Sequence, residues 1–145
     1  DIRENILYNL SARLVAAGIN VYHKFVADLT VAENLPALDP FSVIICDAPC
    51  TGSGTWARTP EQLFYFKQEQ IRLFAERQKK IASNVIPYLA AGGLFFYITC
   101  SVFKEENELV VEHIKEKSGM ELLHMQYLDG YSRKADNLFV AVFRK

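Results

Sequence analysis

The sequence predicts an α/β fold with a mostly parallel sheet that ends in an antiparallel hairpin. Two short apolar runs, at residues 42–46 and 94–99, have the β-branched and aromatic composition of buried strands. Amphipathic segments of helical length alternate with them, which is typical of a parallel sheet covered by helices. The chain has 145 residues, half of them hydrophobic and 23% charged, which is the composition of a globular domain.

The first three predicted elements are a helix, a strand and a loop. Residues 3–17 place apolar side chains at helical spacing, and a glycine comes directly after them. Residues 19–27 are predicted to form a strand that ends on Asp28. Pro36 and Pro40 then mark a loop, because proline interrupts both helices and sheets.

A strand, a long helix and a second strand are predicted next. Residues 42–46 are apolar without alternation, so we expect this strand to be buried on both faces. Residues 61–88 predict one long amphipathic helix, and Gly92-Gly93 is expected to end it before the strand at 94–99. The expected core stripe of this helix comprises Leu63, Phe64, Phe66, Ile71, Phe74, Ile81, Val85 and Ile86.

The last predicted elements are a helix at residues 104–117 and two strands at 120–128 and 138–143. A turn-rich segment joins the two strands, so we expect them to form an antiparallel hairpin. No internal repeat, low-complexity tract or flexible linker divides the chain. Residues 1–145 are therefore interpreted as one domain or part of one.

Charge and cysteine content limit the function classes. Sixteen basic and 17 acidic side chains leave a formal net charge of −1, so the net charge alone does not attract nucleic acid strongly. A basic cluster at residues 72–80 is either a solvated helix face or a phosphate contact. No apolar run reaches the roughly 18 residues that span a bilayer, and we expect no signal peptide at the start of the chain. Three cysteines fit a reducing compartment, so we expect a cytoplasmic protein with no membrane partner.

Polar clusters lie directly after both apolar runs, at the end of the strands where an open parallel sheet binds its ligands. Asp47 and Cys50 come after the first run, and Cys100 after the second. Neighbouring strands lie about 4.8 Å apart, so the two thiols can face each other across one cleft. Two thiols and a carboxylate suit covalent chemistry on an electrophilic carbon. The alternative is that both cysteines are structural, as we expect for Cys46, which lies inside the apolar run.

Two other motifs are rejected on their context. Residues 52–57 match the G-x-G-x-x-A fingerprint of dinucleotide sites, but Pro60 interrupts before the next helix. Cys46 and Cys50 are spaced like half a zinc site, but Cys46 would point into the sheet layer and the three histidines fall in other elements. No metal site is therefore expected.

Two sequence blocks resemble the Nol/Nop/Sun family of RNA cytosine-C5 methyltransferases, which includes the bacterial Sun/Fmu-like proteins. The first block is Asp47-Ala-Pro-Cys-Thr-Gly-Ser-Gly-Thr-Trp-Ala-Arg-Thr-Pro, and the second is Thr99-Cys-Ser-Val-Phe-Lys-Glu-Glu-Asn. Upstream, residues 1–4 and 9–18 resemble a second family motif, and residues 26–28 resemble a third. The resemblance covers nearly the whole chain and implies the C-terminal part of a Rossmann-like class I methyltransferase domain that uses S-adenosylmethionine.

The resemblance implies a role for each candidate site residue. Cys100 would be the nucleophile that adds to C6 of cytosine, and Cys50 would promote release of the covalent product. Asp47 would lie between cofactor and base and hydrogen-bond the cytosine edge. Asp1 would bind the ribose hydroxyls of S-adenosylmethionine and Asp28 its adenine, which suits carboxylates at strand ends.

The implied substrate is RNA, with ribosomal RNA favoured over transfer RNA, and the target base must leave its stack to enter the cleft. Pro49 and Trp56 are expected to contact this substrate. Trp56 lies on the loop after Cys50, where it either stacks on a nucleotide or caps the helix at 61–88. The alternative class is a non-catalytic RNA-binding or assembly module that keeps the fold, but such a module has no need of two thiols at strand ends.

The resemblance also implies that the first strand and the glycine-rich cofactor loop of the family lie before Asp1. Without a central strand, buried backbone groups would remain unpaired. We therefore expect residues 1–30 to be displaced or packed against a neighbouring chain, and the isolated chain to bind S-adenosylmethionine weakly or not at all. Micromolar binding in calorimetry would contradict this expectation.

The residues beside the two cysteines favour Cys100 as the nucleophile. Thr99 and Ser101 offer hydroxyls to a thiolate, and the N-terminus of the helix at 104–117 favours negative charge. Cys50 instead comes after a proline, which removes one amide donor from its vicinity. The sequence thus predicts the same order of roles that the resemblance implies.

Overall fold

The computed structural model describes residues 1–145, apart from the side chain of Asn34. Its contacts divide the chain into two compact units, Asp1–Ala37 and Leu38–Lys145. The second unit holds the whole sheet, whose strands are β1 (Phe41–Asp47), β2 (Leu89–Thr99), β3 (Glu121–Leu128) and β4 (Leu138–Arg144). Among the described helices, none has the length and apolar character needed to cross a bilayer.

The first unit contains the predicted N-terminal helix, α1 (Glu4–Ala16), and a 3-10 turn at Ala32–Asn34. The predicted strand at 19–27 is wrong, because this segment joins no ladder in the part of the chain that the structure describes. Its side chains favour an extended backbone, but a strand also needs a partner for its N–H and C=O groups. A hydrogen bond of 3.2 Å from the Ala27 N–H to the Asp1 carbonyl oxygen ties its end to the start of the chain.

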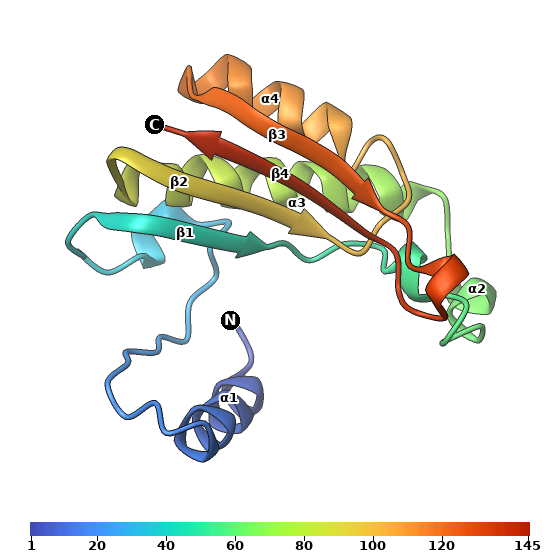
Figure 1. Cartoon of the computed structure of the whole chain (residues 1–145), viewed down its shortest axis with the longest axis horizontal. Coiled ribbons are helices and arrows are strands. Elements are labelled where there is room, and N and C mark those ends of the chain that lie inside the picture. Colours follow the sequence, from blue (N-terminus) through green and yellow to red (C-terminus); the bar gives the residue numbers. More distant parts are fainter. The chain divides into compact units, whose positions relative to one another are not determined.

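The sheet of the second unit is mixed, with the strand order β1-β2-β4-β3 (Figure 1). β1 and β2 are parallel, whereas β4 is antiparallel to both of its neighbours. The predicted α/β class and the antiparallel C-terminal hairpin are therefore confirmed. The described strands include one parallel pair rather than a parallel majority, because residues 19–27 do not extend the sheet.

β1 is an edge strand, so the prediction that it is buried on both faces is wrong. Among the described strands it pairs with β2 alone. Ile44 and Cys46 share the face of Phe95 and Tyr97, which lie opposite them on β2. Ile45 points the other way and is 67% exposed. Continuous hydrophobicity thus predicts the strand, but it does not reveal whether neighbours cover both faces.

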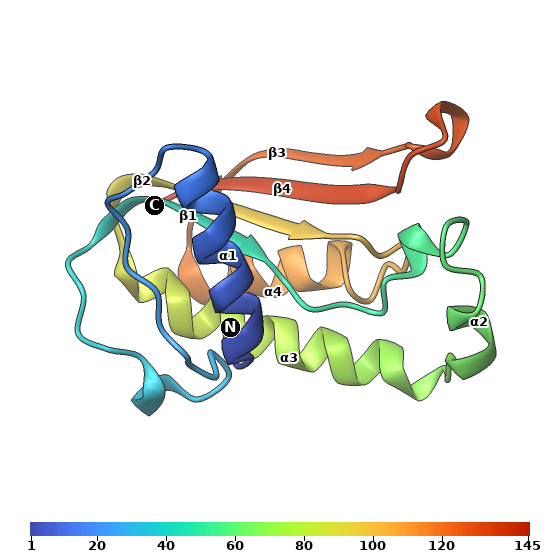
Figure 2. The same ribbon diagram turned by 90° about the horizontal axis from the view of Figure 1, so that it is seen from below.

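Two helices of the second unit, α3 (Glu69–Val85) and α4 (Glu108–Ser118), cover one face of the sheet (Figure 2). The core lies between these helices and the sheet, where apolar side chains exclude water from both layers. The most deeply buried apolar residues of this unit are Ala82, Leu89, Phe95, Tyr97, Val110, Val111, Ile114, Phe139, Ala141 and Phe143.

The predicted helix at 61–88 is broken into α2 (Gln62–Tyr65), α3 and a 3-10 turn at Ile86–Tyr88. The backbone becomes extended at Phe66, and the Gln70 side chain accepts the Lys67 N–H at 3.0 Å, as a cap at the start of a helix does. Leu63 and Phe64 are exposed as a result, Phe64 by 86%, so neither is a core residue as predicted. The buried residues of α3 are Ala75, Gln78, Ile81 and Ala82.

Gly92-Gly93 lies inside β2 and does not end the helix as predicted. Pro87 falls in the 3-10 turn that comes after α3, and a proline cannot continue the hydrogen-bond series of an α-helix. Gly92 adopts a φ of 74°, and the register between β1 and β2 shifts opposite this part of the strand. The two glycines therefore mark an irregularity of the sheet rather than a helix end.

Candidate active site

β1 and β2 bring the two predicted cysteine loops together at their carboxyl ends. Asp47 lies opposite Ile98 in the parallel pair, and the Ala48 N–H donates to the Ile98 carbonyl oxygen at 2.9 Å. A loop then leaves each strand. The Sγ atoms of Cys50 and Cys100 lie 3.2 Å apart, although 50 positions separate the two residues in sequence. The structure thus places the two thiols against each other, as the strand positions predict.

The two thiols differ in acidity because they share one hydrogen bond. Donation from Cys50 lowers the pKa of Cys100 from 9.0 to about 7, against the opposing effects of partial burial and of the Asp47 charge. The same hydrogen bond raises the pKa of Cys50, and burial adds to the effect. Near neutral pH, Cys100 is therefore the sulfur that carries the larger thiolate fraction.

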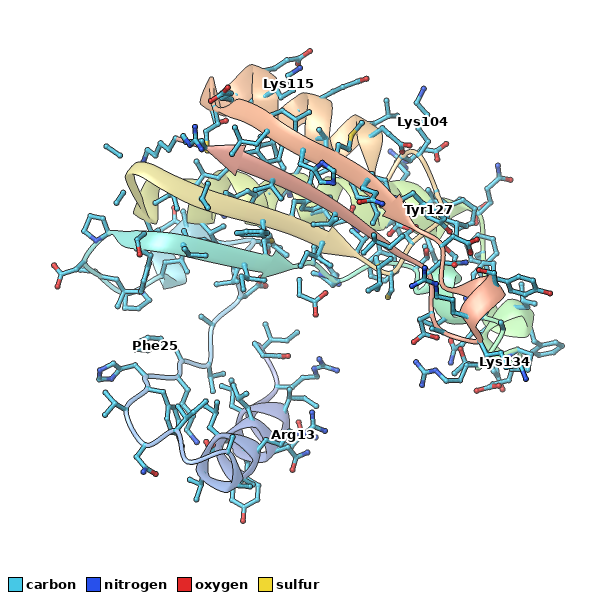
Figure 3. All side chains as sticks on the ribbon, in the orientation of Figure 1. Arg13, Phe25, Lys104, Lys115, Tyr127 and Lys134 are labelled. Carbon is cyan, nitrogen blue, oxygen red and sulfur yellow. The ribbon has the colours of Figure 1, made fainter. Side chains whose placement is uncertain are left out.

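The flanking hydroxyls do not serve the Cys100 thiolate as predicted. Thr99 donates its hydroxyl to Asn107 Oδ1 at 2.6 Å, and Ser101 donates its own to Glu106 Oε2 at 2.5 Å. α4 begins at Glu108 rather than at residue 104, and Lys104 lies on the turn ahead of it (Figure 3). The donor that lowers the pKa of Cys100 comes instead from across the site.

A fully buried carboxylate, that of Glu106, joins the two loops. Its Oε1 atom accepts the Thr51 N–H at 2.9 Å and Gln78 Nε2 at 3.0 Å. Its Oε2 atom accepts the hydroxyls of Thr51, at 2.6 Å, and Ser101. The sequence interpretation missed this residue. Glu106 lies in the second family block, but two adjacent glutamates give no sign of which one is buried.

Gly54 brings a third chain segment to the site. Its N–H donates to the Cys100 carbonyl oxygen at 2.8 Å, and its own carbonyl oxygen accepts the Asn137 N–H at 3.0 Å. The neighbouring Ser53 hydroxyl accepts the Val102 N–H at 2.9 Å. These hydrogen bonds thus hold together the loop after β1, the loop after β2 and the segment before β4.

The other predicted site residues of the second unit lie on the loop after β1. Asp47 is exposed, and within the described contacts its carboxylate has no hydrogen-bond partner. Pro49 is exposed, and its carbonyl oxygen accepts Gln78 Nε2 at 2.9 Å. Trp56 is half-buried, with its ring edge-on to Phe66 at 4.9 Å between centroids. Its contact with a nucleotide stays a prediction.

Cys46 is separate from the thiol pair. It is buried in the sheet layer, where burial raises its pKa to about 12, so it is a poor nucleophile at neutral pH. The described residues contain no group of three or more histidine, cysteine or acidic side chains placed to hold a metal ion.

Asp1 and Asp28 belong to the first unit, where the backbone contact between Ala27 and Asp1 brings them near each other. The Asp1 carboxylate accepts the Arg3 N–H at 2.9 Å and the Arg3 guanidinium at 3.0 and 3.1 Å. Asp28 Oδ1 accepts the N–H and the hydroxyl of Thr30 at 2.9 and 2.7 Å. Each carboxylate is thus bonded to the residue two positions later in the chain, and the roles of both toward a cofactor stay predictions.

The hydrogen bond between the thiols predicts how alkylation of Cys100 depends on pH. Its rate of reaction with iodoacetamide should rise through a midpoint near pH 7, since the thiolate is the reactive form. Cys50→Ala removes the donor and should move the midpoint upward, whereas Cys50→Ser keeps a hydroxyl donor and should move it less. Mass spectrometry of the Cys100 peptide measures the rate at each pH. An unchanged midpoint in Cys50→Ala would exclude this hydrogen bond as the cause.

Solved structures define the class of fold. The chain matches NSun6 from Pyrococcus horikoshii, determined with SFG, with a TM-score of 0.86 and 24% identity over 100% of this chain and 40% of that one. It matches a methyltransferase homolog from the same organism with a TM-score of 0.80 and 25% identity, over 100% of this chain and 52% of that one. The fold is therefore that of the Rossmann-like methyltransferases.

The sequence comparison defines the family. A family model described as 16S rRNA methyltransferase RsmB/F matches residues 2–141, so the chain belongs to this family. A curated relative, ribosomal RNA small subunit methyltransferase F of Vibrio cholerae, is 34% identical over 79 residues. Those residues are 54% of this chain and 17% of the relative, so the match spans less than a fifth of that protein. The resemblance to Sun/Fmu-like RNA methyltransferases is thereby confirmed.

Proposed function

We propose that the protein transfers a methyl group from S-adenosylmethionine to C5 of a cytosine in RNA, with ribosomal RNA as the favoured substrate. One observation carries this proposal: two thiols lie 3.2 Å apart at the ends of parallel strands, in a chain of the RsmB/F family. The C5 carbon of cytosine is not nucleophilic until another group adds to the ring. A nucleophile that adds and a second group that ends the reaction account for both thiols.

Cys100 is assigned the attack because its pKa is the lower of the two. Its thiolate adds to C6, forms a carbon–sulfur bond and makes C5 nucleophilic. When bound, S-adenosylmethionine supplies the methyl group that C5 takes. The C5 proton must then leave, and the sulfur must depart from C6 as a thiolate. We assign this proton transfer to Cys50.

The change in charge at Cys100 explains when Cys50 acts. In the resting site, the hydrogen bond to Cys100 and the Cys100 charge both raise the pKa of Cys50. Adduct formation removes that charge, so Cys50 can lose its proton to solvent and then accept the C5 proton. Departure of the sulfur restores the Cys100 thiolate and, with it, the hydrogen bond from Cys50.

The carboxylates and the loop after β1 complete the proposal. Asp47 has an exposed carboxylate that can accept hydrogen bonds from the amino group of cytosine and from the cofactor. Asp1 and Asp28 are assigned to the ribose and the adenine of S-adenosylmethionine, and Pro49 and Trp56 to the substrate. Residues 1–145 then form part of an S-adenosylmethionine-dependent methyltransferase domain that acts in the cytoplasm.

The nature of the methylated nucleoside tests this proposal. The full-length protein, incubated with unmodified ribosomal RNA and isotope-labelled S-adenosylmethionine, should yield labelled 5-methylcytidine after nuclease digestion and mass spectrometry. Cys100→Ala should abolish the product, whereas Cys46→Ala, which removes the third thiol, should retain it. A labelled methyl group on a base nitrogen or on the ribose would contradict the cysteine adduct.

A further inference from the structure

We infer that Glu106 is a positioning residue that holds the loop carrying Cys50 against the loop carrying Cys100, and so sets the distance between the two thiols. The geometric part of this inference stands by itself, and its catalytic consequence rests on the proposed function. Neither the proposed attack nor the proposed release uses Glu106. Its carboxylate is nevertheless bonded to Thr51 and Ser101, which are the residues directly after the two cysteines in the chain.

The carboxylate of Glu106 is fully buried and receives four hydrogen bonds from three elements of the fold. Thr51 supplies two of them, Ser101 one, and Gln78 of α3 the fourth. None of the ion pairs found among the described residues includes Glu106. Burying a carboxylate costs free energy unless hydrogen-bond donors surround it. The four donors stabilise the Glu106 carboxylate, and the carboxylate in turn fixes the positions of the three residues that donate to it.

Three further hydrogen bonds fix Glu106 and the Cys100 loop, two of them to residues of β2. The Tyr97 hydroxyl donates to the Glu106 carbonyl oxygen at 2.5 Å. Asn107 accepts the Thr99 hydroxyl and donates to the Ser101 carbonyl oxygen at 2.8 Å, so it holds both neighbours of Cys100. Cys100 is therefore anchored without the Glu106 side chain. The loop that carries Cys50 is held at Pro49 by Gln78 and at Gly54 by the Cys100 carbonyl oxygen, and between these two points Thr51 binds it to the Glu106 side chain.

This asymmetry predicts which thiol moves when the carboxylate is removed. In Glu106→Ala the Thr51 N–H and hydroxyl lose the carboxylate, and the stretch that carries Cys50 can relax away from Cys100 between its anchors at Pro49 and Gly54. Displacements of about 1 Å reduce the rate of a positioned reaction by up to about a hundredfold. Attack by Cys100 should persist, although more slowly at neutral pH, because a displaced Cys50 no longer lowers the pKa of Cys100. Release through Cys50 should also slow, so Glu106→Ala should accumulate the covalent adduct between Cys100 and C6.

The rate of disulfide formation between Cys50 and Cys100 reports their distance without requiring activity. The full-length protein is treated with diamide, which accepts two electrons and two protons from the thiols, and the linked peptide is quantified by mass spectrometry. We expect oxidation to be slower by about tenfold in Glu106→Ala, and unchanged in Glu105→Ala, an exposed neighbour of the same charge. Glu106→Gln keeps the reach and can satisfy the same four partners once the two hydroxyls turn to accept, so it should stay within about twofold of the wild type.

Two outcomes overturn the inference: oxidation of folded Glu106→Ala at the wild-type rate, or equal slowing in Glu105→Ala. If Glu106→Ala does not fold, Thr51→Val removes one hydrogen bond to the carboxylate and should slow oxidation by about threefold; an unchanged rate there also overturns it. Failure of Cys50→Ala to form an adduct with RNA would instead contradict the proposed function, because the oxidation assay involves neither RNA nor cofactor.

Discussion

Full-length protein carrying Cys50→Ala should accumulate a covalent protein–RNA adduct that survives denaturing gel electrophoresis. Cys100 remains to attack C6, whereas the group assigned to release is gone. Cys100→Ala should give neither adduct nor methylated RNA. The measurement is the fraction of labelled RNA that migrates with the protein after incubation with S-adenosylmethionine.

The pH of this experiment matters because the two effects of Cys50→Ala oppose each other. Loss of the Cys50 donor raises the pKa of Cys100 towards its ordinary 9.0, so attack slows at neutral pH even though release is blocked. Incubation near that pH restores the thiolate and should increase the adduct. Adduct in Cys100→Ala and none in Cys50→Ala would reverse the two roles. Normal turnover in both variants would make both thiols structural.

Gly54→Ala should lower the free energy of unfolding by about 2–3 kcal/mol, because overpacking a closed site displaces backbone. A Cβ at this position would overlap the Asn137 carbonyl oxygen and lie 2.9 Å from the Cys100 carbonyl oxygen. Both obstacles are backbone atoms, so no side-chain rotation relieves them. Urea denaturation measures the loss, and the diamide assay should show slower pairing of the two thiols.

Gly119→Ala is the matched control for this substitution. Gly119 has a φ of 67° and open space around a Cβ, so alanine there causes backbone strain without a clash and should cost about 1 kcal/mol. Its thiol oxidation rate should equal that of the wild type. If Gly54→Ala lowers the free energy of unfolding no more than Gly119→Ala does, the three segments that meet at Gly54 can move apart at little cost.

The meeting of Cys50 and Cys100 was predictable because it depends on chain direction alone. Two parallel neighbouring strands bring the loops at their carboxyl ends to the same edge of the sheet, and the apolar runs identify those strands whatever covers them. The difference in pKa between the two thiols was harder to predict from the sequence. It arises from one sulfur donating to the other across the site, whereas the sequence offers only near neighbours such as Thr99 and Ser101 as donors.

Structural features that depend on residues far away in the chain could not be predicted from the sequence. Residues 19–27 have the composition of a strand and no ladder, since composition does not provide a neighbour. Ile45 is as apolar as a core residue and is exposed at the edge of the sheet. Glu106 is as charged as a surface residue and is buried, because four donors from elsewhere in the chain converge on it. Binary patterning is informative where burial follows polarity, and these residues depart from that rule.

The position of β4 means that the sheet of the second unit cannot form until nearly the whole chain has been synthesised. β4 comes last among the described strands in sequence, yet it lies between β2 and β3 in the sheet. Until it is synthesised, the nascent chain exposes an open edge of β2 and leaves β3 unpaired, and such edges recruit strands from other chains. A product that stalls or is cleaved between β3 and β4 should therefore aggregate.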